Sequence, residues 1–302
     1  MGTIALKIDV DTYRGTREGV PRLAAALERA GARATFLFSL GPDHTGRAIK
    51  RVFRRGFLGK VRRTSVTQHY GVKTLLYGVL LPGPHIGRRC ADVMREVARR
   101  GFEVGVHTYD HIRWQDGVAR ASEAWTRRLL VLAREEFIRV FDRTPEVHGA
   151  AGWQVNASVP ELERELGFRY ASDTRGNGPF VPVVGGAEVA VPQLPTTLPT
   201  LDELIGRDDL GGVDPVTHLL ELTKDGRQDQ VFTLHAELEG GAYLEGFERL
   251  LRAWRDRGFA LTDLATHAQT LEVPRLPRCE IVSGTVAGRS GTLAIQKHGS
   301  HL

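Results

Sequence analysis

The chain has 302 residues, of which 41% are apolar and 25% are charged, a composition that excludes a disordered or collagen-like protein and allows a sizeable core. Its two cysteines, Cys90 and Cys279, exclude a disulfide scaffold and a cysteine-based zinc ribbon, and they fit a reducing compartment. The formal charge of +5 is concentrated in residues 44–91, which hold eleven Lys or Arg and no Asp or Glu, so the rest of the chain is net acidic.

The first elements predict a β-α-β unit. Residues 4–8 form an apolar run, residues 20–27 carry apolar side chains at helical spacing, and residues 34–39 form a second apolar run. Such a unit implies parallel strands joined by a right-handed crossover. Asp9 directly follows the first run and interrupts what would be the apolar stretch of a signal peptide, so we expect a cytoplasmic protein.

The same alternation continues after the basic segment. Helical patterns cover residues 90–100, 119–140, 160–166 and 246–257, and strand-like runs cover residues 102–106, 147–150, 168–171, 231–234 and 259–261. Repeated β-α units predict an α/β barrel or an open parallel sheet. We expect one domain over residues 1–273, followed by a mobile tail over residues 274–302 that is rich in Gly and Ser.

Two acids follow the first predicted strand. Asp9 and Asp11 share one face of the chain, because alternate positions of a strand point the same way. In α/β folds, ligands and catalytic groups gather at the carboxyl ends of the strands. Taken singly, either Asp also fits a helix cap or a turn.

Two histidines follow the run at residues 102–106 in the same manner. His107 and His111 stand four residues apart, so one helical turn brings both imidazoles to one metal ion. Together with one carboxylate they would leave coordination positions open for water and substrate, as a catalytic metal site requires. The spacing alone is a weak signal, because it also occurs by chance.

Three further polar residues follow strand-like runs. His235 ends the run at residues 231–234 and is either a functional group or a histidine satisfied within the core. Asp173 and Arg175 follow residues 168–171. An Asp can orient an imidazole, and an Arg can hold an anion.

Together these residues carry a resemblance to a known family. The chain resembles the polysaccharide deacetylases of the NodB-homology type over about residues 1–265. The matching segments, in order, are Asp9-Val10-Asp11, His107 with His111, Ser172-Asp173 and Leu234-His235. The resemblance implies a distorted (β/α) barrel and a metal-dependent amide hydrolase.

The resemblance also implies a role for each matching residue. By it, the metal ligands are Asp11, His107 and His111. Asp9 would be the general base, His235 the general acid, and Asp173 would orient a catalytic partner. The metal would be Zn²⁺, Mn²⁺ or Co²⁺, and the sequence does not choose among them.

The chain departs from the family pattern at two places. Val10 separates two acids that are adjacent in many members, so the roles of Asp9 and Asp11 are open to exchange. Residues 150–153 read Ala-Ala-Gly-Trp where the family usually has an Arg-Pro pair. Arg175 is a candidate replacement for the missing arginine.

Four segments resemble one branch of this family more narrowly. They are residues 7–23, 150–153, 198–200 and 235–237. That branch removes a formyl group from an amino sugar carried by undecaprenyl phosphate, which implies a lipid-linked sugar as substrate. Two alternatives stay open: a deacetylase of another amino sugar or polysaccharide, and a non-catalytic protein that binds at a membrane surface.

The basic segment contains a predicted amphipathic helix at residues 47–61. Ile49, Val52, Phe53 and Phe57 fall on one face, and Lys and Arg side chains surround them. This pattern suits the surface of an anionic membrane, where each basic residue contributes about 1 kcal/mol. The alternative is a charged surface helix packed on the barrel.

The same segment limits the kind of partner. No nucleic-acid partner is expected, because no known binding module accompanies the charge. The apolar run at residues 74–81 is far shorter than the roughly 20 residues that span a bilayer, and it is suited to a shallow apolar wedge. We therefore expect a peripheral protein at the cytoplasmic face of the inner membrane.

Overall fold

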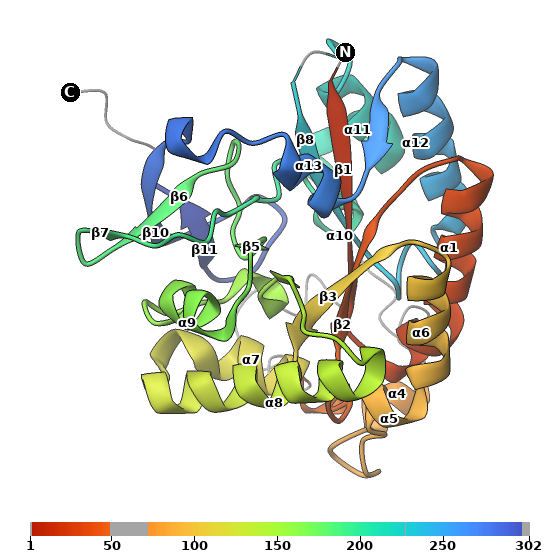
Figure 1. Ribbon diagram of the computed structural model, residues 1–302. Helices are drawn as coiled ribbons and strands as arrows, with labels where there is room; N and C mark the ends of the chain where they lie inside the picture. The colour runs from red at the N-terminus through yellow and green to blue at the C-terminus, as the bar shows by residue number, and fades with distance from the viewer. Residues whose placement is uncertain (1, 49–71, 227, 298–302) are drawn as a thin grey trace.

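A parallel β-sheet forms the centre of the protein (Figure 1). The computed structural model describes residues 2–48, 72–226 and 228–297. The strands of this sheet are β1 Thr3–Val10, β2 Thr35–Ser39, β3 Glu103–Thr108, β4 Val147–His148, β5 Tyr170–Ala171, β8 Gln230–His235 and β9 Ala260–Thr262. Their order in space is β5-β4-β3-β2-β1-β8, and β9 also pairs with β1. Every pairing is parallel, as the β-α-β pattern predicts.

Helices join successive strands. The longer helices are α1 Val20–Arg29, α6 Ala91–Arg99, α8 Glu123–Phe141, α9 Val159–Leu166, α11 Pro215–Leu222 and α12 Leu244–Asp256. Shorter ones are α4 Val72–Leu76, α5 Ile86–Arg89, α7 His111–Gly117, α10 Leu201–Leu204 and α13 Leu264–Gln269, and single turns are η1 Gly15–Gly19, η3 Val118–Arg120, η4 Ala151–Trp153, η5 Asp208–Leu210 and η6 Val273–Arg275. In Figure 1, α12, α1 and α6 follow one another along one side of the sheet.

Local sequence sets the ends of α8, the longest of these helices. The Ser122 hydroxyl accepts a hydrogen bond from the backbone N–H of Trp125 and so caps the first turn. The helix stops at Asp142, which adopts a left-handed conformation with φ of 55°. Between these ends, Ala133 and Phe137 are buried in the main core.

The central strand β1 separates two environments. Ile4, Leu6 and Ile8 pack into the core that lies under the helices. Lys7 and Asp9 occupy the alternate positions and face the opposite side, the interior of the curved sheet. Both faces of β1 are therefore buried, as is usual for a parallel sheet, and its polar side chains gather on the inner side.

A second sheet contains the end of the chain. Its strands β11 Leu293–Gln296, β10 Arg278–Gly284, β6 Val181–Val184 and β7 Ala187–Glu188 lie in that order. The expectation that residues 274–302 form a mobile tail is wrong for these segments, because β10 pairs in parallel with β6 and antiparallel with β11. The division of the chain at residue 273 stays a prediction.

The basic segment is only partly described. Residues 49–61 of the predicted amphipathic helix lie outside the described residues, which resume at residue 72 just before α4. In the described parts of the chain, no helix is both long and apolar enough to cross a bilayer. Cys90 and Cys279 are buried free thiols, in agreement with the predicted absence of a disulfide scaffold.

Candidate active site

Five of the polar residues singled out in the sequence meet at the carboxyl ends of β1, β3 and β8, namely Asp9, Asp11, His107, His111 and His235. Asp9 lies next to His235 in the parallel register of β1 and β8, so both stand at the same level of the sheet. Between β2 and β3 the register shifts, because Phe38 pairs with Val106 and Ser39 with Thr108. His107 is the extra residue of this bulge, and a bulge of this kind can re-aim a side chain at a site.

Asp11, His107 and His111 form one compact group. One atom from each side chain lies within 4.8 Å of the others. The Asp11 Oδ1 atom is 3.2 Å from His107 Nε2, and the Asp11 Oδ2 atom is 3.3 Å from His111 Nε2. Burial alone would raise the pKa of the Asp11 carboxyl, but the two imidazoles hold that pKa well below its usual range.

The His107 ring is fixed in the orientation that a metal ligand needs. Its Nδ1–H donates a hydrogen bond to the carbonyl oxygen of Gly149 over 2.6 Å. This bond leaves Nε2 as the nitrogen with a lone pair, directed at Asp11. The Asp11 Oδ1 atom is buried and accepts no hydrogen bond. Two imidazoles and one carboxylate with an unsatisfied oxygen fit a divalent ion such as Zn²⁺, Mn²⁺ or Co²⁺.

Glu237 fixes the loop that carries Asp11. Its Oε1 atom accepts hydrogen bonds from the backbone N–H groups of Asp11 and Thr12 and from the Thr12 hydroxyl. Burial, together with the charge of Asp11, raises the pKa of Glu237 to about 8. Gly15 permits this contact, because a Cβ there would lie 2.0 Å from Oε1. Glu237 is not among the site residues predicted from the sequence.

Asp9 is 2% exposed and lies beside the metal-ligand group. Its Oδ2 atom is 3.5 Å from the ammonium nitrogen of Lys7. Its Oδ1 atom is 3.8 Å from His107 Nδ1 and makes no hydrogen bond. One oxygen is thus paired with a cation, and the other is able to accept a proton.

His235 lies on the far side of Asp9 from β2. Its backbone N–H donates to Glu239, whose pKa burial raises to about 8. Its ring meets the Trp153 ring edge to face, with centroids 6.3 Å apart. The carboxylate nearest to its Nδ1 atom is that of Asp202, at 3.9 Å. The sequence offered no signal for Asp202, which arrives through a long connection after β7.

Asp173 contacts His148, which is not one of the histidines of the candidate active site. Its carboxylate accepts from the Ala150 N–H and the Gln193 side chain, and lies 3.2 Å from His148 Nδ1. Glu163 approaches the same nitrogen at 2.5 Å. Burial alone would lower the pKa of His148, but the two carboxyl groups raise it to about 10. Asp173 therefore belongs to a buried ionic cluster behind the site.

Arg175 also has partners outside the metal-ligand group. Its guanidinium forms an ion pair with Glu203 and donates to the carbonyl oxygen of Leu198 over 2.9 Å. It also lies over the Trp153 ring, 5.3 Å from the centroid. The replacement of the missing family arginine by Arg175 stays a prediction, and the carboxylate that its guanidinium contacts in the described chain is that of Glu203.

Comparison with known proteins identifies the family of this chain. A family model described as polysaccharide deacetylase matches residues 2–171. The chain belongs to the polysaccharide deacetylase family. The expectation of an amidohydrolase that acts on a linear amide is confirmed with it.

Two relatives of this deacetylase family match almost the whole chain. A protein of Shewanella sediminis is 34% identical over 294 residues, covering 97% of this chain and 94% of the relative. A protein of Wigglesworthia glossinidia brevipalpis is 31% identical over 288 residues, covering 94% and 98%. Both are described as probable 4-deoxy-4-formamido-L-arabinose-phosphoundecaprenol deformylases.

Solved structures of the family share the fold. A putative polysaccharide deacetylase from Mycobacterium smegmatis aligns with a TM-score of 0.63 at 17% identity and covers 94% of both chains. A probable polysaccharide deacetylase from Pseudomonas aeruginosa aligns with a TM-score of 0.59 at 14% identity, over 88% of this chain and 89% of that one. The distorted (β/α) barrel expected of this deacetylase is confirmed.

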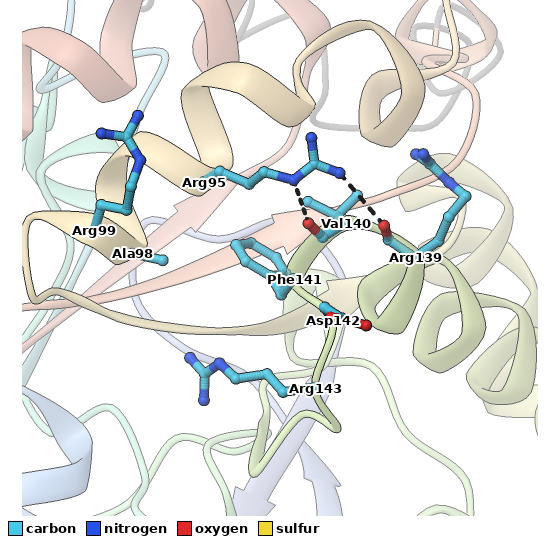
Figure 2. A pocket seen from close by; sticks show the side chains of 8 residues that line it. All are labelled: Arg95, Ala98, Arg99, Arg139, Val140, Phe141, Asp142 and Arg143. Carbon is cyan, nitrogen blue, oxygen red and sulfur yellow. Dashed lines mark hydrogen bonds between the residues drawn. The ribbon is translucent and has the colours of Figure 1, made fainter.

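One surface hollow of this deacetylase lies apart from its candidate active site (Figure 2). This hollow, of about 610 Å³, is lined by α6 and the end of α8. The Arg95 side chain donates there to the carbonyl oxygens of Val140 and Arg139, which end α8. Arginine at a helix carboxyl end satisfies free carbonyls and the helix dipole, so this hollow is explained by helix packing.

Proposed function

We propose that this protein is a metal-dependent hydrolase of undecaprenyl-phosphate 4-deoxy-4-formamido-L-arabinose. It removes the formyl group and gives formate and the 4-amino-4-deoxy-L-arabinose lipid used to modify lipid A. The observation that carries the proposal is the group Asp11, His107 and His111, with Asp9 and His235 beside it. The similarity to two full-length relatives described as deformylases supports the choice of substrate.

The proposed metal ligands are Asp11, His107 and His111. Their geometry supports this assignment over an exchange of Asp9 and Asp11, because Asp11 contacts both Nε2 atoms while Asp9 faces the Nδ1–H side of His107. When bound, a divalent ion polarises the amide carbonyl and lowers the pKa of water from 15.7 toward about 7.

Asp9 and His235 divide the proton transfers of the proposed reaction. Asp9 takes a proton from water at its unpaired Oδ1 atom as the water oxygen attacks the formyl carbon. His235 gives a proton to the sugar nitrogen as the carbon–nitrogen bond breaks, since an unprotonated amine leaves poorly. The Asp202 carboxylate lies 3.9 Å from the Nδ1 atom of His235 and favours the orientation of that ring.

The proposed reaction is tested by mass measurement on the lipid-linked formamido sugar. We expect the full chain, supplied with Zn²⁺, Mn²⁺ or Co²⁺, to lower the mass of the lipid by about 28 units, the difference between a formyl group and hydrogen. The control is His107→Ala, which removes a proposed ligand and should leave the mass unchanged. An unchanged mass with the unmodified chain would contradict the proposal, and faster hydrolysis of the N-acetyl analogue would favour a deacetylase.

A peripheral position on an anionic membrane, at the cytoplasmic face of the inner membrane, completes the proposal. Val79 is 52% exposed, Leu80 75% and Leu81 37%, all in the connection between α4 and α5. The exposed arginines Arg88 and Arg89 follow on α5. An apolar tip beside basic side chains suits the interface of an anionic bilayer.

Flotation with liposomes tests this membrane contact. Leu80→Asp should weaken binding of the full chain to vesicles containing an anionic lipid by about tenfold or more, because it removes apolar area worth roughly 1.5–3 kcal/mol and adds a negative charge. Leu222→Asp is the matched control, since Leu222 is 51% exposed but lies on α11, away from α4 (Figure 1). Equal flotation of the two variants would argue against contact through the α4–α5 connection.

A further inference from the structure

Lys7 is a lysine whose side chain is completely shielded from water in the middle of β1. It is 0% exposed and stands two residues before Asp9, on the same face of the strand. Its ammonium nitrogen donates to the carbonyl oxygen of Ser172 over 2.8 Å and is 3.5 Å from Asp9 Oδ2. It also lies 5.3 Å from the centroid of the Trp153 ring.

The Lys7 side chain crosses the inner side of the curved sheet. Ser172 directly follows β5, the edge strand that is separated from β1 by β2, β3 and β4 in the order of the sheet. The lysine side chain therefore reaches from the central strand to the far edge. Its ammonium group lies beside Asp9, and the hydrogen bond to Ser172 fixes that group relative to the Asp9 carboxylate.

A buried ammonium group needs a compensating partner. Removing a charge from water costs far more than burying an apolar side chain of similar length, unless an opposite charge and hydrogen bonds offset the cost. Among the described residues, the carboxylate that forms an ion pair with Lys7 is that of Asp9. A cation kept at this cost beside a proposed catalytic group points to a role in the site.

The ion pair with Lys7 gives the two carboxylate oxygens of Asp9 different surroundings. Oδ2 is next to the ammonium group, while Oδ1 is buried without a hydrogen bond. Without Lys7, Asp9 would be a buried carboxylate two residues from the carboxylate of Asp11, with no ammonium or guanidinium group in reach within the described chain. Like charges so close to one another repel, which favours rotation of one side chain away from the other.

We propose that Lys7 is a positioning residue that holds Asp9 through Oδ2 and keeps Oδ1 available for the proton of the attacking water. The inference rests on the role of Asp9 in the proposed function. Lys7 supplies a cation beside Asp9, whereas the guanidinium of Arg175 pairs with Glu203. The cation beside the base therefore comes from the same strand as the base.

Kinetics of four forms of the full chain test the inference: the unmodified chain, Lys7→Met, Asp9→Asn and the double variant. Lys7→Met keeps the side-chain length and removes the charge. We expect it to lower kcat by about 100-fold, with KM and bound metal within about threefold of the unmodified chain. In the Asp9→Asn background the same change should lower kcat less than threefold, because the carboxylate that Lys7 holds is already absent.

Thr35→Val controls for the loss of a buried polar group. Thr35 is also fully buried and is the β2 partner of Lys7 in the parallel register, but its hydroxyl bonds to Glu103 and to the N–H of Leu264 and not to Asp9. It should keep kcat even if its melting temperature falls as far as that of Lys7→Met. Lys7→Met with unchanged kcat, or with an equal loss in both backgrounds, would overturn the positioning role.

Crystal structures of the same variants give a readout that needs no substrate. In Lys7→Met the Asp9 carboxylate should leave its position or occupy two, whereas in Thr35→Val it should not move. An unmoved Asp9 in Lys7→Met would overturn the inference by itself. If the unmodified chain fails to hydrolyse the lipid-linked sugar, the proposed function fails, and the Asp9 position still decides whether Lys7 holds it.

Discussion

Asp9→Asn is expected to lower kcat for deformylation by about 10²- to 10⁴-fold while the bound metal stays in place. The amide has nearly the shape of the carboxylate, but its oxygen is a far weaker base. The Asp9→Asn variant is expected to keep the metal, because the Nε2 atoms of His107 and His111 face Asp11 and not Asp9. Steady-state kinetics and metal analysis on the same preparation separate these two effects.

Asp92→Asn is the matched control for this change. Asp92 is an exposed carboxylate that pairs with Arg17 on the surface, so its loss should leave kcat unchanged. The comparison with Asp11→Asn decides the exchange of roles that the sequence left open. Loss of metal in Asp9→Asn and retention in Asp11→Asn would show that the two acids have the opposite roles.

The central part of the site was predictable because it depends on local pattern. Asp9, His107 and His235 each directly end or follow an apolar run, and parallel strands bring their carboxyl ends to one edge. No knowledge of loop conformation is needed for that inference. Asp11 and His111 lie within a few residues of those strands, so their positions follow as well.

The residues that support the site were not predictable in the same way. Lys7 is one charged residue inside an apolar strand, and although it begins the matching segment at residues 7–23, that match gives it no role. Asp202 reaches His235 through a connection whose path depends on the second sheet. Asp173 follows a strand as expected, yet the histidine beside it is His148, because β4, which carries His148, pairs with β5.

The end of the chain shows a related limit. Residues after 274 are rich in Gly and Ser, which favours mobility when local composition is the only information. In the structure β10 finds its partner in β6, far away in the sequence. The connection from β10 to β11 also returns Arg289 to the site region, where its guanidinium lies over the Trp153 ring and pairs with Glu203. Non-local pairing of this kind leaves no periodic signal in a short window.

The second large effect is expected on removing one metal ligand. His111→Ala should abolish stoichiometric metal binding and lower kcat by about 10³-fold or more, since a catalytic metal stabilises the transition state by several kcal/mol. Two ligands, Asp11 and His107, would remain, fewer than the three protein ligands that catalytic sites usually have. Metal content by elemental analysis and kcat are measured on the same sample.

His218→Ala is the control for this change, because His218 lies on α11 and takes no part in the metal-ligand group. Exhaustive chelation of the unmodified chain should reproduce the loss without any mutation. Refilling with Zn²⁺, Mn²⁺ or Co²⁺ should then restore activity to the unmodified chain but not to His111→Ala, because only the former retains all three ligands. Full activity in a chelated sample that contains no measurable metal would refute the metal requirement, and Asp9 and His235 alone would then have to account for the reaction.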